Sequence, residues 1–74
     1  MKQYKVTENN ITYDIYEYVS GNKYWILNGK RHRENGPAIE YANGEKNYWY
    51  NGKYLIHINS DEELKRYIKL LSIS

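Results

Sequence analysis

The sequence predicts a mainly β protein of the α+β class: a single antiparallel β-meander of five to six strands followed by one C-terminal amphipathic helix. The first observation is the spacing of the five glycines, which recur every seven or eight residues, four of them after an asparagine. The second is the composition of the runs between them, rich in Tyr, Ile, Val, Trp and Thr, which suit a pleated, half-buried sheet. The third is a change to helical periodicity after residue 60.

Asn-Gly pairs predict the turns of the meander. A type I′ turn needs positive φ angles at both central residues, and Asn-Gly tolerates them at little cost. Asn28-Gly29, Asn43-Gly44 and Asn51-Gly52 are therefore each expected to join two antiparallel strands. Strands joined in this way are neighbours, so the simplest topology is an up-and-down meander.

The expected strands are short and precede the helix. They span Gln3 to Thr7, Ile11 to Val19, Lys23 to Leu27, Ala38 to Ala42, Glu45 to Tyr50 and Lys53 to Ile58. The segment from Lys30 to Pro37 is the exception, because it is too long for a tight turn and Pro37 cannot donate a hydrogen bond to a ladder. We expect a protruding loop or a short irregular edge there.

Ser60 begins the expected helix. Glu63 follows it by three residues, which is the capping-box pattern, and acidic residues fill the first turn. One apolar stripe recurs at helical spacing: Leu64, Tyr67, Ile68 and Leu71. The 74 residues are thus expected to form one domain, with the meander in residues 1–58 and the helix in residues 60–72. The stripe should pack on one face of the sheet.

Two-residue alternation divides the strand residues between two faces. One set is expected beneath the helix: Ile11, Tyr13, Ile15, Trp25, Leu27, Trp49 and Leu55. The opposite set is dominated by tyrosine: Tyr16, Tyr18, Tyr24, Ile26, Ile39, Tyr41, Tyr48, Tyr50, Tyr54 and Ile56. One short helix cannot cover both faces, and a large exposed aromatic patch marks contact with a protein, a ligand or another copy of the chain. The tyrosine-rich face is therefore the main candidate for a binding surface.

The composition narrows the function classes. No cysteine is present, which excludes a disulfide framework and a thiolate zinc site, and two histidines alone make a weak metal site, so no metal or cofactor is expected. No run is long and apolar enough to cross a membrane, and the N-terminus lacks a secretory apolar region, so a cytoplasmic protein is expected. The net charge of +2 is mild, and the basic residues cluster in one place, at Lys30, Arg31 and Arg33 around His32.

An enzyme is the least favoured class. His32 and His57 could supply the imidazole acid–base pair of a small ribonuclease, but they lie in different segments of the sequence. His32 is better explained as a turn-stabilising residue that bonds to nearby backbone, and His57 as a partly buried histidine. We therefore predict a non-catalytic protein.

Two segments of the sequence echo each other. They are Tyr24-Trp25-Ile26-Leu27-Asn28-Gly29-Lys30 and Tyr48-Trp49-Tyr50-Asn51-Gly52-Lys53, with one extra residue in the first. Between them runs Arg31-His32-Arg33-Glu34-Asn35-Gly36-Pro37-Ala38-Ile39. The combined pattern, W-x-x-N-G-K-x-H-R-x-x-G-P-A, resembles the MORN-like repeat variant found in small proteins of phages and large DNA viruses. The resemblance covers about half of the chain and implies stacked β-hairpins, although the second segment continues with Tyr54-Leu55-Ile56-His57 in place of the His-Arg pair.

The resemblance also implies a phage accessory protein, a kind that often binds and blocks a host enzyme or defence complex. The hypothesis is a phage-type counter-defence inhibitor (anti-CRISPR-like) that acts in the cytoplasm of an infected host and binds a host protein or ribonucleoprotein complex. The expected partner-binding residues are Tyr16, Tyr18, Tyr24, Tyr41, Tyr48, Tyr50, Arg31, His32 and Arg33. A nucleic-acid-binding module and a self-associating homodimer are the alternatives, since aromatic rings beside basic groups also bind single strands.

Overall fold

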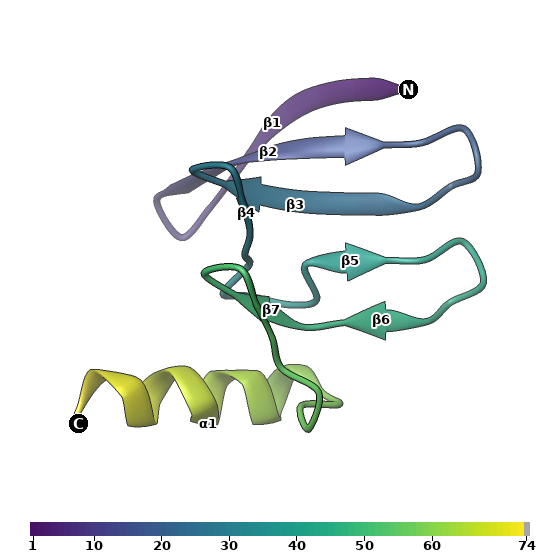
Figure 1. The fold of residues 1–74 in the computed structure, drawn as a ribbon. Helices are drawn as coiled ribbons and strands as arrows, with labels where there is room; N and C mark the ends of the chain where they lie inside the picture. Colours follow the sequence, from purple (N-terminus) through teal and green to yellow (C-terminus); the bar gives the residue numbers. More distant parts are fainter. Residues whose placement is uncertain (74) are drawn as a thin grey trace.

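An antiparallel sheet with one C-terminal helix makes up the protein, as predicted, in a computed structural model that describes residues 1–73. The elements in order are β1 (Lys2–Glu8), β2 (Ile11–Glu17), β3 (Lys23–Leu27), β4 (Lys30–Arg31), β5 (Ile39–Glu40), β6 (Lys46–Asn47), β7 (Trp49–Tyr50), β8 (Lys53–Tyr54) and α1 (Asp61–Ser72). The main sheet has the order β1-β2-β3-β5-β6, with β4 also paired to β3, and β7 and β8 form a separate hairpin. The helix lies across the β6–β7 end of this stack (Figure 1).

The turns follow the asparagine and glycine pattern closely. Asn28–Gly29 and Asn51–Gly52 have positive φ at both residues, so the type I′ predictions are confirmed there. Asn9–Asn10 adopts the same angles without glycine. The prediction at residues 43–44 is wrong, because only Gly44 has a positive φ and its N–H closes a wider turn on the Tyr41 carbonyl at 3.0 Å.

The chain contains two copies of a 23-residue unit. Glu17 in β2 and Glu40 in β5 each pair with a lysine six residues later, and they are 23 residues apart. The residues paired in β7–β8 likewise lie 23 residues after those paired in β3–β4. The extra residue inferred from the sequence is therefore absent, and Trp25 is equivalent to Tyr48 rather than to Trp49.

Strand boundaries differ from the prediction mainly where the sheet breaks. Lys23–Leu27 agrees to the residue, and β4 is a strand that the sequence did not suggest. The predicted strand from Glu45 to Tyr50 is divided between two sheets at Tyr48, whose carbonyl accepts the Leu55 N–H at 2.9 Å. This bond turns the backbone out of the main sheet. The other expected strands ending at Val19, Ala42 and Ile58 stop earlier because turns begin there.

A row of alternating charges crosses the main sheet. Residues directly opposite one another across five strands are Lys2, Glu17, Lys23, Glu40 and Lys46. Opposite charges at facing positions stabilise a pair of strands, whereas a shift by one residue would also turn every side chain to the other face. The acidic members of this row point to the same face as the buried Ile15 and Trp25, by two-residue alternation.

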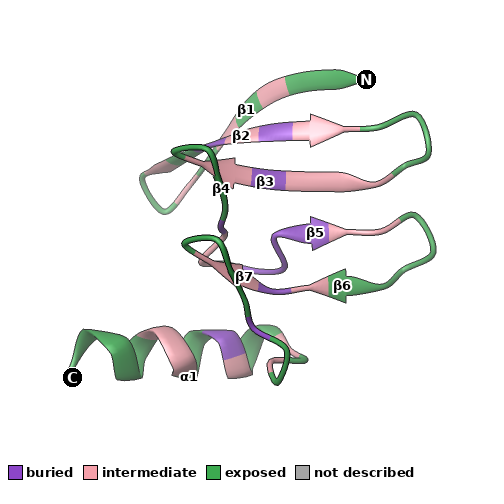
Figure 2. Cartoon of the chain, in the orientation of Figure 1, coloured by how far each residue is buried: buried purple, intermediate pink, exposed green. Residues whose placement is uncertain are grey.

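The core consists of two clusters. The first contains Tyr13, Ile15, Trp25 and Ala38, with Tyr4, Val6, Ile11, Leu27 and Trp49 packed around them. The second contains Tyr48, Leu55 and Leu64, with Tyr50, Ile58, Tyr67 and Ile68. Figure 2 shows buried residues both in the central strands and at the start of the helix. The helix thus covers the second cluster alone, and the prediction that it lies over Ile11, Tyr13, Ile15, Trp25, Leu27 and Trp49 is wrong.

Residues 32–38 cover the first cluster in place of the helix. His32, Gly36, Pro37 and Ala38 are all buried, so the expected protruding loop is wrong. The segment turns inward because the Arg33 side chain finds its hydrogen-bond partners above Trp25.

The helix begins as predicted. The Ser60 hydroxyl accepts the Glu63 N–H at 3.2 Å, and the Glu63 carboxylate accepts the Asn59 N–H at 2.8 Å. Both bonds satisfy backbone donors that a helix start leaves unpaired. Leu64 is fully buried against Tyr48 and Leu55, so the helix closes the end of the repeat stack. No helix within residues 1–73 is long and apolar enough to span a membrane.

The Tyr48→Phe variant is expected to lose less free energy of unfolding than wild type in alkaline solution. Burial, together with the hydrogen bond to Asp61, raises the pKa of Tyr48 from 10.0 to about 12. The unfolded chain therefore releases this proton first, so the contribution of Tyr48 is complete below pH 10 and is lost as the pH rises toward 12. Losing the bond to Asp61 should cost about 1 kcal/mol at neutral pH.

Urea unfolding at several pH values measures both effects. The variant should be less stable than wild type at neutral pH and should lose less free energy of unfolding between pH 10 and 12. Tyr18→Phe, at a position that is 42% exposed, is the control for removing a hydroxyl. Equal losses for wild type and Tyr48→Phe over this range would contradict the prediction.

Candidate functional site

Arg33 lies inside the fold. Its Nε and Nη2 donate to the two carboxylate oxygens of Glu8 at 3.0 and 2.8 Å, and its Nη1 donates to Glu40 at 2.9 Å and to the Pro37 carbonyl at 3.2 Å. The guanidinium lies over the Trp25 ring, 3.5 Å from its centroid, and the side chain is 13% exposed. Arg33 is therefore a structural residue, and its burial corrects the expectation that it contacts a partner.

The Gly-Pro-Ala segment is shaped by the same guanidinium. A Cβ at Gly36 would lie 3.1 Å from the Arg33 guanidinium, so a larger residue would require the guanidinium to shift by a few tenths of an ångström. Pro37 supplies the carbonyl that Arg33 binds. Ala38 is fully buried, and its carbonyl accepts the Trp25 N–H at 2.7 Å. The motif that carries the family resemblance is thus explained by packing and hydrogen bonding.

His32 links the two repeat units. It is 2% exposed, its Nδ1 accepts the Asn51 N–H at 2.8 Å, and its Nε2 lies 3.1 Å from the Glu34 carboxylate. Because Nδ1 is an acceptor, the ring proton belongs on Nε2, where it is donated to Glu34. The ring packs between Tyr13 and Tyr50, with centroid distances of 6.3 and 4.6 Å. His32 therefore stabilises a turn, the Asn51–Gly52 turn of the second unit. Its burial leaves it no surface for contact with a partner protein.

His57 differs from the expectation. It is exposed in the turn that follows β8, whereas the sequence predicts a partly buried histidine. The strand expected there ends at Tyr54, so two-residue alternation no longer determines its direction. The described part of the chain holds no group of three acidic or histidine side chains placed to bind a metal ion.

Tyr48 and Tyr50 belong to the core beneath the helix. Tyr48 is 3% exposed and its hydroxyl donates to Asp61 at 2.8 Å. Tyr50 is half-buried between His32 and Tyr67, with its ring 6.1 Å from that of Tyr67. Their expected place on an exposed face is wrong, because the strand pairing makes them equivalent to Trp25 and Leu27, which lie on the covered side of the sheet. The helix packs against them there.

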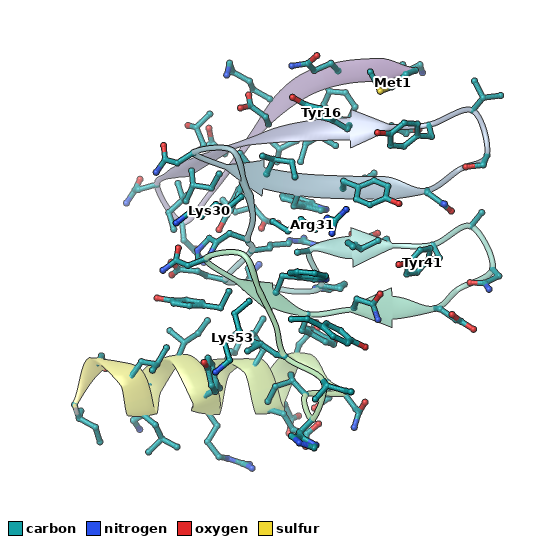
Figure 3. All side chains as sticks on the ribbon, in the orientation of Figure 1. Met1, Tyr16, Lys30, Arg31, Tyr41 and Lys53 are labelled. Atoms are coloured by element: carbon teal, nitrogen blue, oxygen red, sulfur yellow. The ribbon has the colours of Figure 1, made fainter. Side chains whose placement is uncertain are left out.

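The remaining predicted residues gather on one surface, the face of the sheet away from the first cluster. We define the open face as Tyr16, Tyr18, Tyr24, Arg31, Tyr41, Trp49 and Tyr54. Figure 3 labels Tyr16, Arg31 and Tyr41 of this set, and Trp49, at its border, also packs against the first cluster. Tyr16 and Tyr24 are directly opposite each other in β2 and β3. Tyr18 meets Tyr24 edge to face at 5.3 Å. Four of the predicted tyrosines and Arg31 thus share one side of the sheet.

Arg31 joins the two halves of the open face. Its guanidinium lies over the ring of Tyr24 at 5.5 Å and over the ring of Trp49 at 4.9 Å. Trp49 in turn lies 5.3 Å from Tyr54. The result is a continuous strip of ring and cation contacts from Tyr18 to Tyr54.

Trp49 and Tyr54 are not among the binding residues that the sequence predicts. Matching the two Tyr-Trp pairs with each other assigns Trp49 to the core side. Matching the Asn-Gly turns instead makes Trp49 equivalent to Ile26, which alternates with the buried Trp25 and faces away from the first cluster. The signal is therefore present in the turn spacing.

The charge of the open face is positive. Its strands contribute one acid, Asp14, which is bonded to Lys5 at 2.6 Å. Within residues 1–73, Lys30, Arg31 and Lys53 take part in no ion pair. Lys30 and Lys53 project from the neighbouring Asn-Gly turns beside this face (Figure 3). The surface combines aromatic rings with cations that lack a carboxylate partner.

No protein-family model, curated protein or solved structure matches this chain. The resemblance to MORN-like repeats therefore stays a prediction from the motif.

Glu8→Gln is expected to destabilise the fold at neutral pH but not in acid. The hydrogen bonds from Arg33 lower the pKa of Glu8 from its ordinary value of 4.5. The stabilisation from the Glu8 carboxylate is thus complete above pH 4.5 and is lost as the pH falls below it, through the pKa of the folded state. We expect a loss of about 2 kcal/mol at neutral pH, typical of charge-assisted bonds.

Urea titrations from neutral pH to acid measure the difference between wild type and variant. That difference should shrink as the pH falls, because protonated Glu8 resembles glutamine. Glu45→Gln, in an exposed turn, is the matched control and should stay within about 0.5 kcal/mol of wild type. A difference that is independent of pH would refute the role of the Glu8 charge.

Proposed function

We propose that this chain is a non-catalytic binding module that docks on a partner protein through its open face. The observation that carries the proposal is the strip from Tyr18 through Tyr24, Arg31 and Trp49 to Tyr54. Tyrosine, tryptophan and arginine are the residues enriched in binding hot spots, because they supply large contact areas at a small entropic cost. Tyr24, Arg31, Trp49 and Tyr54 lie on hydrogen-bonded strands, so little backbone ordering is needed when a partner binds.

A partner with an acidic surface fits this face best. Lys30, Arg31 and Lys53 have no carboxylate partner within the described chain, whereas Glu8 and Glu40 are engaged by Arg33 on the other side of the sheet. Complementary charge speeds encounter and disfavours partners of the wrong charge. The basic contacts of the module therefore supply selectivity, and the aromatic rings supply most of the contact area.

The kind of partner follows from the motif resemblance. Small proteins of phages that carry such repeats suggest a counter-defence inhibitor, anti-CRISPR-like in kind. In this proposal the partner is a host defence or nucleic-acid-processing complex in the cytoplasm of the infected cell, and the module blocks it by occupying its surface.

Nucleic acid is the second candidate, since Lys30, Arg31 and Lys53 lie beside aromatic rings. The position of Arg31 disfavours it, however. Bases stack on bare ring faces, and the Arg31 guanidinium already lies over Tyr24 and Trp49. Binding to a single strand would also fall steeply with salt, because each phosphate contact releases counterions.

The double variant Tyr16→Ala/Tyr24→Ala is expected to weaken the partner complex by more than about 2 kcal/mol, or about thirtyfold in Kd. The partner is captured from host lysate with the tagged chain, with and without nuclease, and its affinity for the purified chain is then measured. Leu70→Ala/Ile73→Ala, which changes two exposed apolar residues near the end of the helix, is the control.

Circular dichroism checks that both variants keep the fold. Unchanged affinity in the folded tyrosine variant would refute docking through the open face. Retention that disappears with nuclease would favour nucleic acid, and retention of nothing but a second copy would favour a homodimer.

A further inference from the structure

A shallow hollow lies on the open face between the two Asn-Gly turns. Its volume is about 390 Å³, and it is lined by Ile26, Gly29, Lys30, Arg31, Trp49 and Gly52. Nothing lies within 4 Å of the place where a Cβ of Gly29 would be, so the turn leaves the space open. The lining carries two cations and no acidic residue.

The indole N–H of Trp49 lacks an acceptor. It is the one buried side-chain nitrogen or oxygen in the described part of the chain that has no hydrogen-bond partner. Buried donors are almost always paired, so an orphan in a folded protein calls for an explanation. The indole of Trp25, by comparison, donates to Glu40 at 3.2 Å. The lining of the hollow thus includes Lys30 and Arg31, which take part in no ion pair within residues 1–73, and Trp49, whose buried indole N–H has no acceptor.

We propose that this hollow binds one aspartate or glutamate side chain of the partner protein. The carboxylate pairs with the Arg31 guanidinium and, as Arg31 moves from the Trp49 ring, accepts the indole N–H as well. Arginine forms bidentate bonds with carboxylates, and such charge-assisted bonds are the strong ones. This inference rests on the proposed function, because it places one contact of the docked partner.

The surroundings favour an acidic peptide over a run of phosphates. Ile26 and Trp49 give the hollow apolar walls, which suit the aliphatic neighbours of an acidic side chain. The two cations of the lining match a single anionic group, whereas nucleic-acid binding depends on several basic contacts along a backbone.

The test follows the two tryptophan indole N–H signals in ¹⁵N-labelled protein by NMR. The probe is the blocked peptide acetyl-Leu-Glu-Leu-amide, and acetyl-Leu-Gln-Leu-amide is its neutral control. Trp49→Phe assigns the signals by removing one of them. The Trp49 signal should move in a saturable way with the glutamate peptide, the Trp25 signal should stay in place, and the glutamine peptide should bind about tenfold more weakly or worse.

Arg31→Gln should weaken the glutamate peptide by about tenfold or more, with the unperturbed Trp25 signal as the check on folding. Lys65→Gln, on the exposed side of the helix, should leave binding unchanged. An equal response to both peptides, no response of Trp49, or tighter binding of inorganic phosphate or a short single-stranded DNA than of the glutamate peptide would overturn the proposal.

Partner capture separates this proposal from the proposed function. If Tyr16→Ala/Tyr24→Ala abolishes capture while Arg31→Gln and Lys30→Gln leave it unchanged, the hollow is refuted and docking through the open face stands. If none of these variants changes capture, both proposals are refuted.

Discussion

The Arg33 guanidinium is the contact on which the rest of the fold depends. It holds the turn between β1 and β2 through Glu8, the end of β5 through Glu40, and the face of Trp25 in β3. A charge that is largely removed from water must be compensated in full, and these partners compensate it. Residues 32–38 therefore fold inward and cover the first core cluster. Without them, a helix would need to cover that cluster.

The 23-residue repeat explains how one face of the strands packs in the core while the other face stays open. On its covered face the first unit is built around His32, while Leu55 occupies the equivalent place in the second unit and packs against the helix. The same repetition places the two Asn-Gly turns on either side of the hollow, with Lys30 beside Gly52. The motif residues therefore stabilise the stack, and the residues that alternate with them form the open face.

Local features are predictable from the sequence and distant pairings are not. The strand from Lys23 to Leu27, two of the three predicted type I′ turns and the Ser60 cap depend on neighbouring residues, and these agree with the structure. Arg33 resembles a solvent-exposed cation in the sequence because its partner Glu8 lies 25 residues away. Matching the two Tyr-Trp segments with each other places Tyr48 on the exposed face, whereas the strand pairing makes it equivalent to the buried Trp25. Four tyrosines and Arg31 of the predicted surface do lie together.

The coupling between Glu8 and Arg33 is the most direct measure of the central constraint. Free energies of unfolding of wild type, Glu8→Gln, Arg33→Met and the double variant form a double-mutant cycle at neutral pH. A coupling energy of at least about 2 kcal/mol is predicted, as for a buried bidentate pair that organises its surroundings. A coupling below about 0.5 kcal/mol, the value of an exposed ion pair, would contradict the dependence of the fold on Arg33.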